Sequence, residues 1–238
     1  MNFCIVDSRA DLKILNSIEK LGYEVLPMPP NKNVSVSCSS HPDISLFRLS
    51  NNQLIYSKDL DNAFLYKLEM RNIQMIEGDL YLSSQYPDDI KYNAAKIGNY
   101  LIHKLNSTDG RILKECEARN MKCLNVKQGY SGCSTAVIRD NLAITSDKGI
   151  YDVLKNTGDI HTLLIKPQES IRLFNEKYGF IGGASGRIDD DNFALSGDVD
   201  LLESGEEIKV FFKENNVKLI CLSDEKPVDL GTLMFFTL

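Results

Sequence analysis

Hydrophobic positions along the chain predict five amphipathic helices, because in five segments apolar residues recur every three or four positions. These segments are Asp11–Leu21, Asp59–Met70, Thr108–Ala118, Gly149–Asn156 and Glu206–Asn215. The starts of consecutive segments lie 48, 49, 41 and 57 residues apart, and one fifth of the 238 residues is about 48. The sequence therefore predicts an internal repeat of five units.

Short runs of β-forming residues surround these helices. One run follows each helix: Tyr23–Leu26, Gln74–Ile76, Lys122–Val126, His161–Ile165 and Val217–Leu222. Four helices are also preceded by a pair of runs with the pattern of a hairpin: Ile44–Leu49 with Gln53–Tyr56, Ala94–Ile97 with Tyr100–His103, Thr135–Ile138 with Leu142–Thr145, and Gly186–Ile188 with Phe193–Leu195. Asn and Gly at most of the joints suit tight turns.

The two ends of the chain complete the pattern. Only one run, Phe3–Asp7, precedes the first helix, while Gly231–Leu238 ends the chain without a partner. Pairing of these two runs would cover both strand edges and close a ring of five ββαβ units. We therefore predict an α/β fold, a five-bladed propeller forming a single domain over residues 1–238. A doubly wound open sheet is the alternative, but it predicts single strands between helices.

Composition narrows the classes of partner. Apolar residues make up 43% and charged residues 25% of the chain, as in an ordinary globular protein. The net charge of −6 gives no general attraction to nucleic acids or anionic membranes, so neither partner is expected. An acidic residue as early as Asp7 is unlike a signal peptide, which predicts a cytoplasmic protein. The six Cys show no C-x-x-C pair, so we predict free thiols, no metal site and no cofactor.

Several short runs resemble an uncharacterised bacterial family of the pentein superfamily, the guanidine-modifying enzymes, whose fold consists of five ββαβ units. These runs are 40–44 (SHPDI), 86–93 (YPDDIKYN), 127–134 (KQGYSGCS), 144–150 (ITSDKGI), 178–186 (YGFIGGASG) and 196–198 (SGD). The resemblance covers nearly the whole chain. The resemblance implies the fold of that family, but it implies no particular activity.

Characterised penteins imply a site chemistry at the fivefold axis. There a Cys attacks the guanidinium carbon, a His moves protons and carboxylates bind the guanidinium N–H groups. His41 and Asp43 resemble the His-x-Asp of arginine and agmatine deiminases, although here the pair lies in an earlier unit. The nucleophile of those enzymes lies near the C-terminus, where residues 229–233 of this chain contain no Cys. The Cys in a comparable glycine-flanked loop is Cys133.

Each candidate residue has a structural alternative. Cys133 is either the nucleophile or a small buried residue at a tight bend, and His41 is either a proton carrier or a turn residue beside Pro42. Asp147 also fits a helix N-cap, and the loop at Gly183 and Ser185 fits a tight entry into a hairpin. The residues predicted to bind substrate are Asp198, Asp147, Asn93, Asp89, Gly183 and Ser185, with Asp43 and Asp198 holding the cation.

Two functions remain open at this stage. The first is a hydrolase or amidinotransferase-like enzyme acting on a small guanidino or amide-like compound, with Cys133, His41 and Asp43 as its catalytic residues. The second is a non-catalytic pentein that binds a small molecule or a protein partner, and the oligomeric state is open for both. They differ in geometry, because the enzyme requires the Cys133 sulfur and the His41 ring on the same mouth of the central cavity and within about 7 Å of each other.

Overall fold

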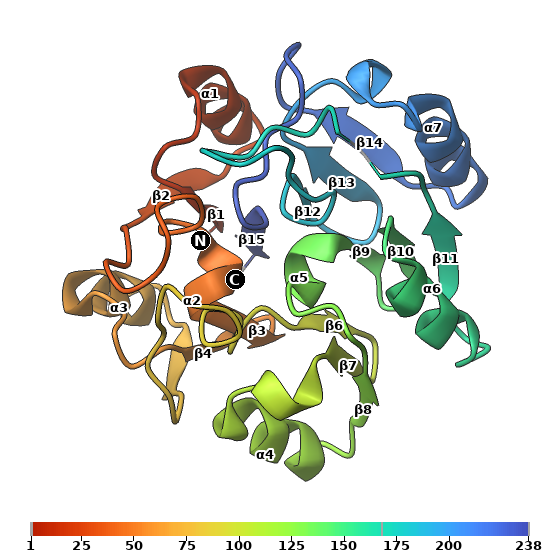
Figure 1. Cartoon of the computed structure of the whole chain (residues 1–238). Helices are drawn as coiled ribbons and strands as arrows, with labels where there is room; N and C mark the ends of the chain where they lie inside the picture. Colours follow the sequence, from red (N-terminus) through yellow and green to blue (C-terminus); the bar gives the residue numbers. More distant parts are fainter. Residues whose placement is uncertain (1, 168, 238) are drawn as a thin grey trace.

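Five small α/β units surround a common centre in the computed structural model, which describes residues 2–167 and 169–237 (Figure 1). The strands named in the structure are distributed over five three-stranded sheets, so a single open sheet is not formed. In each sheet the first two strands are antiparallel, and the third returns parallel to the second after a helix. The predicted five-unit repeat is therefore present.

Four units are continuous in sequence. The first has β3 (Leu46–Ser50), β4 (Gln53–Tyr56), α3 (Asn62–Glu69) and β5 (Gln74–Glu77). The second has β6 (Ala95–Ile97), β7 (Tyr100–His103), α4 (Gly110–Ala118) and β8 (Lys122–Asn125). The third has β9 (Thr135–Arg139), β10 (Leu142–Thr145), α6 (Lys148–Lys155) and β11 (His161–Leu164). The fourth has β12 (Ser185–Arg187), β13 (Asn192–Leu195), α7 (Gly205–Glu214) and β14 (Lys218–Cys221).

The fifth unit combines both ends of the chain: β15 (Met234–Thr237), β1 (Asn2–Asp7), α1 (Leu12–Lys20) and β2 (Glu24–Met28). The predicted pairing of the terminal runs is confirmed, because β1 pairs antiparallel with β15. Phe3 lies opposite Phe236, and their rings stack with centroids 4.8 Å apart. Leu238, the end of the predicted run, lies outside the described residues. Among the described residues no strand ladder joins one sheet to the next, so a continuous closed sheet is not shown.

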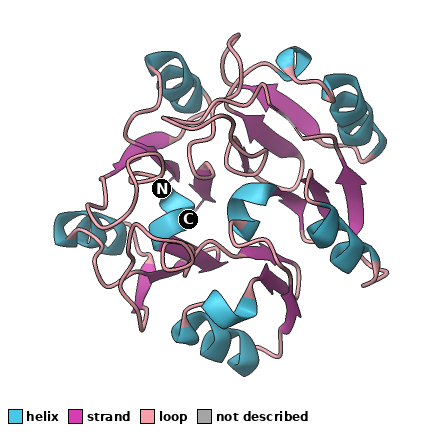
Figure 2. Ribbon diagram, viewed as in Figure 1, coloured by secondary structure: helices cyan, strands magenta, loops and turns pink. Residues whose placement is uncertain are grey.

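The hydrophobic core is divided into five clusters, each between two neighbouring units. Phe3 and Ile5 of β1, for example, pack with Leu46 and Leu54 of the next unit. On the other side of the same strand, Cys4 packs with Ala194 of β13. This alternation follows from the strand period of two, which points successive side chains to opposite faces of a sheet. Every unit therefore buries apolar surface against both neighbours, while α1, α3, α4, α6 and α7 lie on the outside (Figure 2).

Two helical turns near the centre were not predicted. They are α2 (Pro42–Ser45) and α5 (Ser131–Ser134), which lead into β3 and β9. The strand predicted from Ile44 accordingly begins at Leu46, because Pro42 favours the first turn of a helix. Short 3-10 turns, η1 (Leu105–Ser107) and η2 (Val199–Leu201), precede α4 and α7. No helix among residues 2–167 and 169–237 is long and apolar enough to cross a membrane.

Candidate active site

The candidate site is built from one recurring position, the segment that leads into the first strand of a unit. Asp43 lies in α2 before β3, and Cys133 lies in α5 before β9. Asn93 and Thr232 lie shortly before β6 and β15. Because the first strands of the five units line the same central cavity, these segments also meet at the centre. Residues far apart in the sequence are thereby brought into contact.

Cys133 is held by direct hydrogen bonds. Its Sγ lies 3.0 Å from Asp43 Oδ2, to which the thiol donates, and Asn93 Nδ2 donates to Sγ over 3.1 Å. The Cys133 backbone N–H donates to Asn93 Oδ1 over 3.2 Å, so the amide of Asn93 fixes both ends of the cysteine. Thr232 Oγ1 also donates to Asp43 Oδ2, over 2.8 Å. The sulfur therefore has a defined position.

His41 lies beside this pair with both ring nitrogens unpartnered. One ring nitrogen of His41, one oxygen of Asp43 and the Cys133 sulfur lie within 4.8 Å of one another. This satisfies the distance predicted for a Cys–His pair. The ring also lies between two carboxylates, with Nε2 3.7 Å from Asp7 Oδ2 and Nδ1 3.8 Å from Asp229 Oδ1. Only 2% of His41 is exposed, yet neither nitrogen forms a hydrogen bond.

A glycine allows His41 to take this position. Gly231 has φ of +67°, and a Cβ on it would lie 2.1 Å from the Cβ of His41. An L-residue there would be strained in the backbone and would also collide with the histidine. The Gly231 N–H donates to Asp229 Oδ1, and its carbonyl accepts from the Asp43 N–H. This turn therefore joins the histidine and both carboxylates.

Burial controls the protonation of the cluster. It raises the pKa of Asp43 to about 6, against the hydrogen bonds from Cys133, Thr232 and Asn93, which lower it. It also raises the pKa of the Cys133 thiol, and the negative charges of Asp43 and Asp229 raise it further. The thiolate character expected of a nucleophile is therefore absent without a ligand. Burial lowers the pKa of His41, so its ring is neutral at pH 7.

His41, Asp43 and Cys133 offer nitrogen, oxygen and sulfur donors, a mixture that zinc accepts. The unpartnered nitrogens of His41 and the unpartnered Asp43 Oδ1 are compatible with a cation of some kind at this position. Burial raises the pKa of Asp229; the His41 ring opposes this shift, and repulsion by the negative charge of Asp43 adds to it. A positively charged group between the two carboxylates would remove this repulsion.

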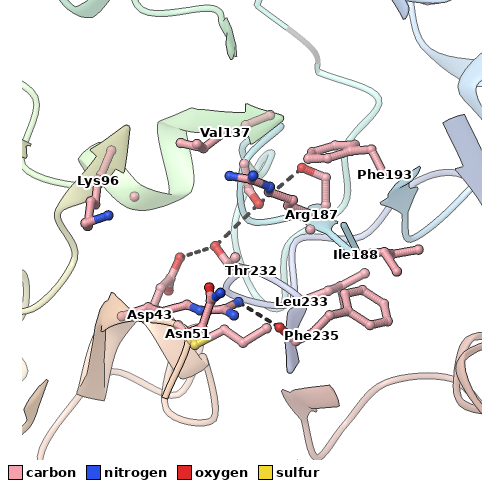
Figure 3. Close-up of a pocket in the computed structure, with 18 of the residues that line it drawn as sticks. Asp43, Asn51, Lys96, Val137, Arg187, Ile188, Phe193, Thr232, Leu233 and Phe235 are labelled. Carbon is pink, nitrogen blue, oxygen red and sulfur yellow. Dashed lines mark hydrogen bonds between the residues drawn. The ribbon is translucent and has the colours of Figure 1, made fainter. Parts of the chain in front are cut away.

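A central cavity of about 720 Å³ reaches Asp43 (Figure 3). It is lined by residues of the first strand of all five units and also by Asp43, Gly132, Gly182 and Thr232. Figure 3 shows the hydrogen bond between Thr232 and Asp43. Cys133 is only 3% exposed, and neither it nor His41 lines the cavity. The distance expected for the Cys–His pair is therefore found, whereas the expected position of both groups at the mouth of the cavity is not; Asp43, which accepts from the thiol, is the member of the cluster that lines the cavity.

Two of the other predicted residues contact this cluster or its cavity. Gly183 donates its N–H to the Cys133 carbonyl, and a Cβ on it would overlap Asp229. Ser185 lines the cavity, although its hydroxyl donates to the Ile181 carbonyl. Asp89 is buried and accepts from the hydroxyl of Tyr130, with its Oδ1 unpartnered.

Two predicted residues lie elsewhere. Asp147 caps α6 by accepting from the Ile150 N–H over 2.8 Å, so the capping interpretation is confirmed. Asp198 accepts from the Asp200 N–H at the start of η2. Neither carboxylate has a recorded contact with Asp43 or Cys133 among the described residues. Asp198, predicted as a cation clamp, is thus not among the residues with a recorded contact to this cluster, whereas Asp229 flanks His41.

Sequence reasoning missed Asp7, Asp229 and Thr232. All three flank the terminal strands, with Asp7 at the end of β1 and the other two before β15. Pairing of those strands was predicted, and extending it by a few residues would have brought Asp7 and Asp229 to the same end of the sheet. The predicted pairing of the terminal strands was therefore the signal in the sequence that could have located these two residues.

Known proteins establish the fold. An inosamine-phosphate amidinotransferase from Streptomyces griseus superposes with a TM-score of 0.55 at 10% identity, over 92% of this chain and 75% of that one. An agmatine deiminase from C. jejuni gives 0.54 at 13% identity, over 98% and 92%. A DDAH from Pseudomonas aeruginosa, complexed with citrulline, gives 0.50 at 7% identity, over 99% and 98%.

The arrangement of five ββαβ units is thus the pentein fold, as the resemblance of the sequence implied. Within that class the chain belongs to a family of unknown function, DUF6873, whose family model matches residues 5–234. No curated protein sequence matches the chain significantly.

Proposed function

We propose that this protein is an enzyme that acts on a small guanidino or amide-like compound through covalent catalysis by Cys133. In this proposal His41 carries the proton, and Asp43 with Asp229 holds the positive charge of the substrate. One observation carries it: a sulfur, an imidazole nitrogen and a carboxylate oxygen meet within 4.8 Å in a buried cluster. We also propose that the five units are closed into one ring. Residues from both ends of the chain contribute to this site, so the site requires the two ends to lie together.

Substrate binding would also activate the nucleophile. The pKa of Cys133 is raised by burial and by the charges of Asp43 and Asp229. A guanidinium between those carboxylates replaces repulsion of the thiolate by attraction, so the thiol loses its proton more easily. A planar guanidinium suits this position because it can donate to two carboxylates at once. The thiolate would thus form only when a substrate is present.

The covalent step uses the neutral His41. The thiol proton of Cys133 passes to a ring nitrogen of His41, and the sulfur forms a bond to the central carbon of the amidino group. The carbon–nitrogen bond to the leaving amine then breaks, and that nitrogen takes the proton from His41. An amidino group remains on the sulfur. Attack on it by water in a hydrolase, or by a second amine in a transferase, breaks the carbon–sulfur bond and restores the thiol.

The names of the structural neighbours are consistent with this chemistry. They include amidinotransferases, an agmatine deiminase and dimethylarginine dimethylaminohydrolases. Two were solved with citrulline or an S-methyl-L-thiocitrulline adduct, compounds of the size that a small central site accepts. At 7–13% identity these likenesses support the choice of substrates to test and do not carry the proposal.

The test is a screen of guanidino compounds, including agmatine, arginine and methylated arginines. We expect one of them to raise the melting temperature of the protein, because a ligand of the native state stabilises it. The same compound should release an amine or a ureido product. Cys133→Ser should abolish product formation, whereas Cys123→Ser, which changes an exposed thiol, should not. A compound turned over equally by Cys133→Ser would overturn the covalent mechanism.

A non-catalytic ligand-binding protein is the second candidate. It is favoured by the raised pKa of Cys133 and by the near-complete burial of this thiol. It predicts a stabilising guanidino compound that is never converted and that protects Cys133 from alkylation. Treatment with EDTA distinguishes both candidates from a metal-binding site. If turnover or binding is lost with EDTA and restored by zinc, the cluster binds a metal ion.

A further inference from the structure

The central cavity presents two cations that have no anionic partner. Arg48 of β3 and Lys96 of β6 both line it, and neither forms an ion pair within the described part of the chain. Most other charged groups of the lining are neutralised. Arg187 pairs with Asp140 and Asp190, and Asp191 pairs with Arg139. Although the lining contains five carboxylates and three cations in all, Arg48 of β3 and Lys96 of β6 are thus the cations of the lining that have no ion pair among the described residues.

Arg48 is fixed in place but only partly satisfied. Its guanidinium donates to the Phe235 carbonyl over 2.7 Å and lies 4.3 Å from the centre of the Phe236 ring. These contacts orient the side chain without neutralising its charge. The remaining N–H groups have no acceptor among the described residues, and they are not enclosed by protein, so they are available to the cavity. Burial, reinforced by the charge of Arg187, lowers the pKa of Arg48 to about 10.

Lys96 of β6 lies on another wall of the same cavity (Figure 3). Its ammonium has no hydrogen bond within residues 2–167 and 169–237. Burial lowers the pKa of Lys96; the negative charge of Asp140 opposes this shift, and the charges of Arg187 and Arg48 add to it. Two half-buried cations that repel each other cost free energy in the empty protein. A bound anion would recover that cost by pairing with both.

The remaining charges of the lining leave this region open to an anion. Asp189 accepts hydrogen bonds from Asn192 and from the backbone at the hairpin turn. Asp43 accepts from Cys133 and Thr232. The lining also includes the apolar side chains of Leu46, Leu233 and Phe235. The lining therefore suits a small molecule with one anionic group and an apolar body.

We propose that the central cavity is a binding site for a small molecule that carries a carboxylate or a phosphate, held by Arg48 and Lys96. This goes beyond the chemistry proposed for Cys133 and does not depend on it, because neither cation contacts the Cys133 cluster. The anionic group is bound on the cavity side of Asp43, and the sulfur and the His41 ring lie outside the cavity lining.

The test is isothermal titration calorimetry with inorganic phosphate and, separately, with succinate, at constant ionic strength. We expect one of the two anions to bind, and the tighter one distinguishes phosphate from carboxylate recognition. Lys96→Met should weaken that binding about tenfold or more, since each hydrogen bond to a charged group contributes on that scale. Lys96 holds no other residue in place, so this variant should fold. Arg48→Met should weaken binding similarly.

Two controls separate this site from the catalytic proposal and from general salt effects. Lys148→Met removes a cation from the outer helix α6 and should leave anion binding unchanged. Cys133→Ser should also leave it unchanged, although that variant abolishes the proposed turnover. Absence of binding by both anions to the wild-type protein would overturn the anion site. Binding that survives in the double variant of Arg48 and Lys96 would overturn it as well.

Discussion

The protonation state of Asp43 affects both the chemistry of the site and the stability of the fold. It is 5% exposed, its Oδ1 has no partner, and burial raises its pKa from 3.8 to about 6. A carboxyl group with a raised pKa binds its proton more tightly in the folded state. The charged form that a cation would require is therefore costly in the empty protein, and part of the binding energy of a ligand must offset this cost.

The first prediction concerns the pH dependence of this cost. Between about pH 4 and pH 6 the folded protein binds more protons at Asp43 than the unfolded chain, so the free energy of unfolding falls as pH rises. The loss reaches about 3 kcal/mol by pH 7. Asp43→Asn cannot ionise and should be more stable relative to wild type at pH 7 than at pH 4 by about this amount. Urea unfolding at both pH values measures the difference.

A comparison with a second carboxylate tests the sign of this pH dependence of stability. Arg187 lowers the pKa of Asp190, first through a hydrogen bond and then through its charge. Asp190→Asn should therefore lose stability relative to wild type at pH 7 and lose less at a pH below the lowered pKa. His41 titrates in all of these proteins, and its contribution largely cancels from each comparison. An Asp43→Asn difference that is the same at pH 4 and pH 7 would contradict the prediction.

At the scale of single elements, helix N-caps explain four acidic residues, one of which, Asp147, was predicted to bind substrate. Asp147 accepts from the Ile150 N–H at the start of α6, and Asp11, Asp61 and Asp109 cap α1, α3 and α4. Four of the five outer helices thus begin with an Asp whose side chain accepts a backbone N–H. A recurring Asp in a repeat protein is therefore explained by helix geometry before any chemistry is invoked.

The second prediction is that Asp147→Ala weakens α6 and leaves the site intact. Loss of an N-cap costs about 1 kcal/mol, which a shift in the urea midpoint would show. Ligand binding and turnover should be unchanged. Asp152→Ala is the matched control, because it removes an exposed ion pair with Lys148 on the same helix and should change stability by less than about 0.5 kcal/mol. A loss of ligand binding in Asp147→Ala would contradict this prediction and would show that Asp147 contributes to the binding site.

The elements could be predicted from the sequence more completely than the site. Periodicity placed α1, α4, α6 and α7 within two residues of their observed bounds, because each has an apolar stripe and a clear end. The helical turns α2 and α5 are too short for a period to define, so neither was predicted; the strand after Asp43 was predicted to start two residues too early, whereas β9 after Cys133 begins at the predicted Thr135. Asp229 was missed because its contact with His41 depends on a turn close to the far end of the chain.

At the scale of the whole molecule, stability depends on contacts between units. Each of the five apolar clusters lies between two neighbours, and the cluster containing Phe3 and Phe236 joins the N-terminal and C-terminal strands to the unit of β3. No unit has a separate core of its own among these clusters. We infer that residues 1–238 form one cooperative domain, because loss of any unit exposes apolar surface on two others.

The third prediction tests this cooperativity with Phe236→Ala. Phe236 is fully buried, stacks on Phe3 and lies beneath the Arg48 guanidinium. Removal of a buried Phe ring costs about 3–5 kcal/mol. Unfolding followed by far-UV circular dichroism and by tyrosine fluorescence should shift to lower urea with a single shared midpoint.

The tyrosines are distributed over several units, so separate midpoints for the two signals in wild type or variant would show that units unfold independently. Tyr66→Ala serves as the control, because Tyr66 is 62% exposed on α3 and its loss should change stability by no more than about 0.5 kcal/mol.

The pairing of Asn2 with Thr237 has a consequence for how such a protein can be encoded. A short linker would connect these neighbouring positions, and the polypeptide could then be cut at an exposed turn such as Asn51–Asn52 without separating any paired strands. The order of units along the gene is therefore not dictated by the architecture. A circularly permuted coding sequence would specify the same five sheets and bring His41, Asp43 and Cys133 together at the same place.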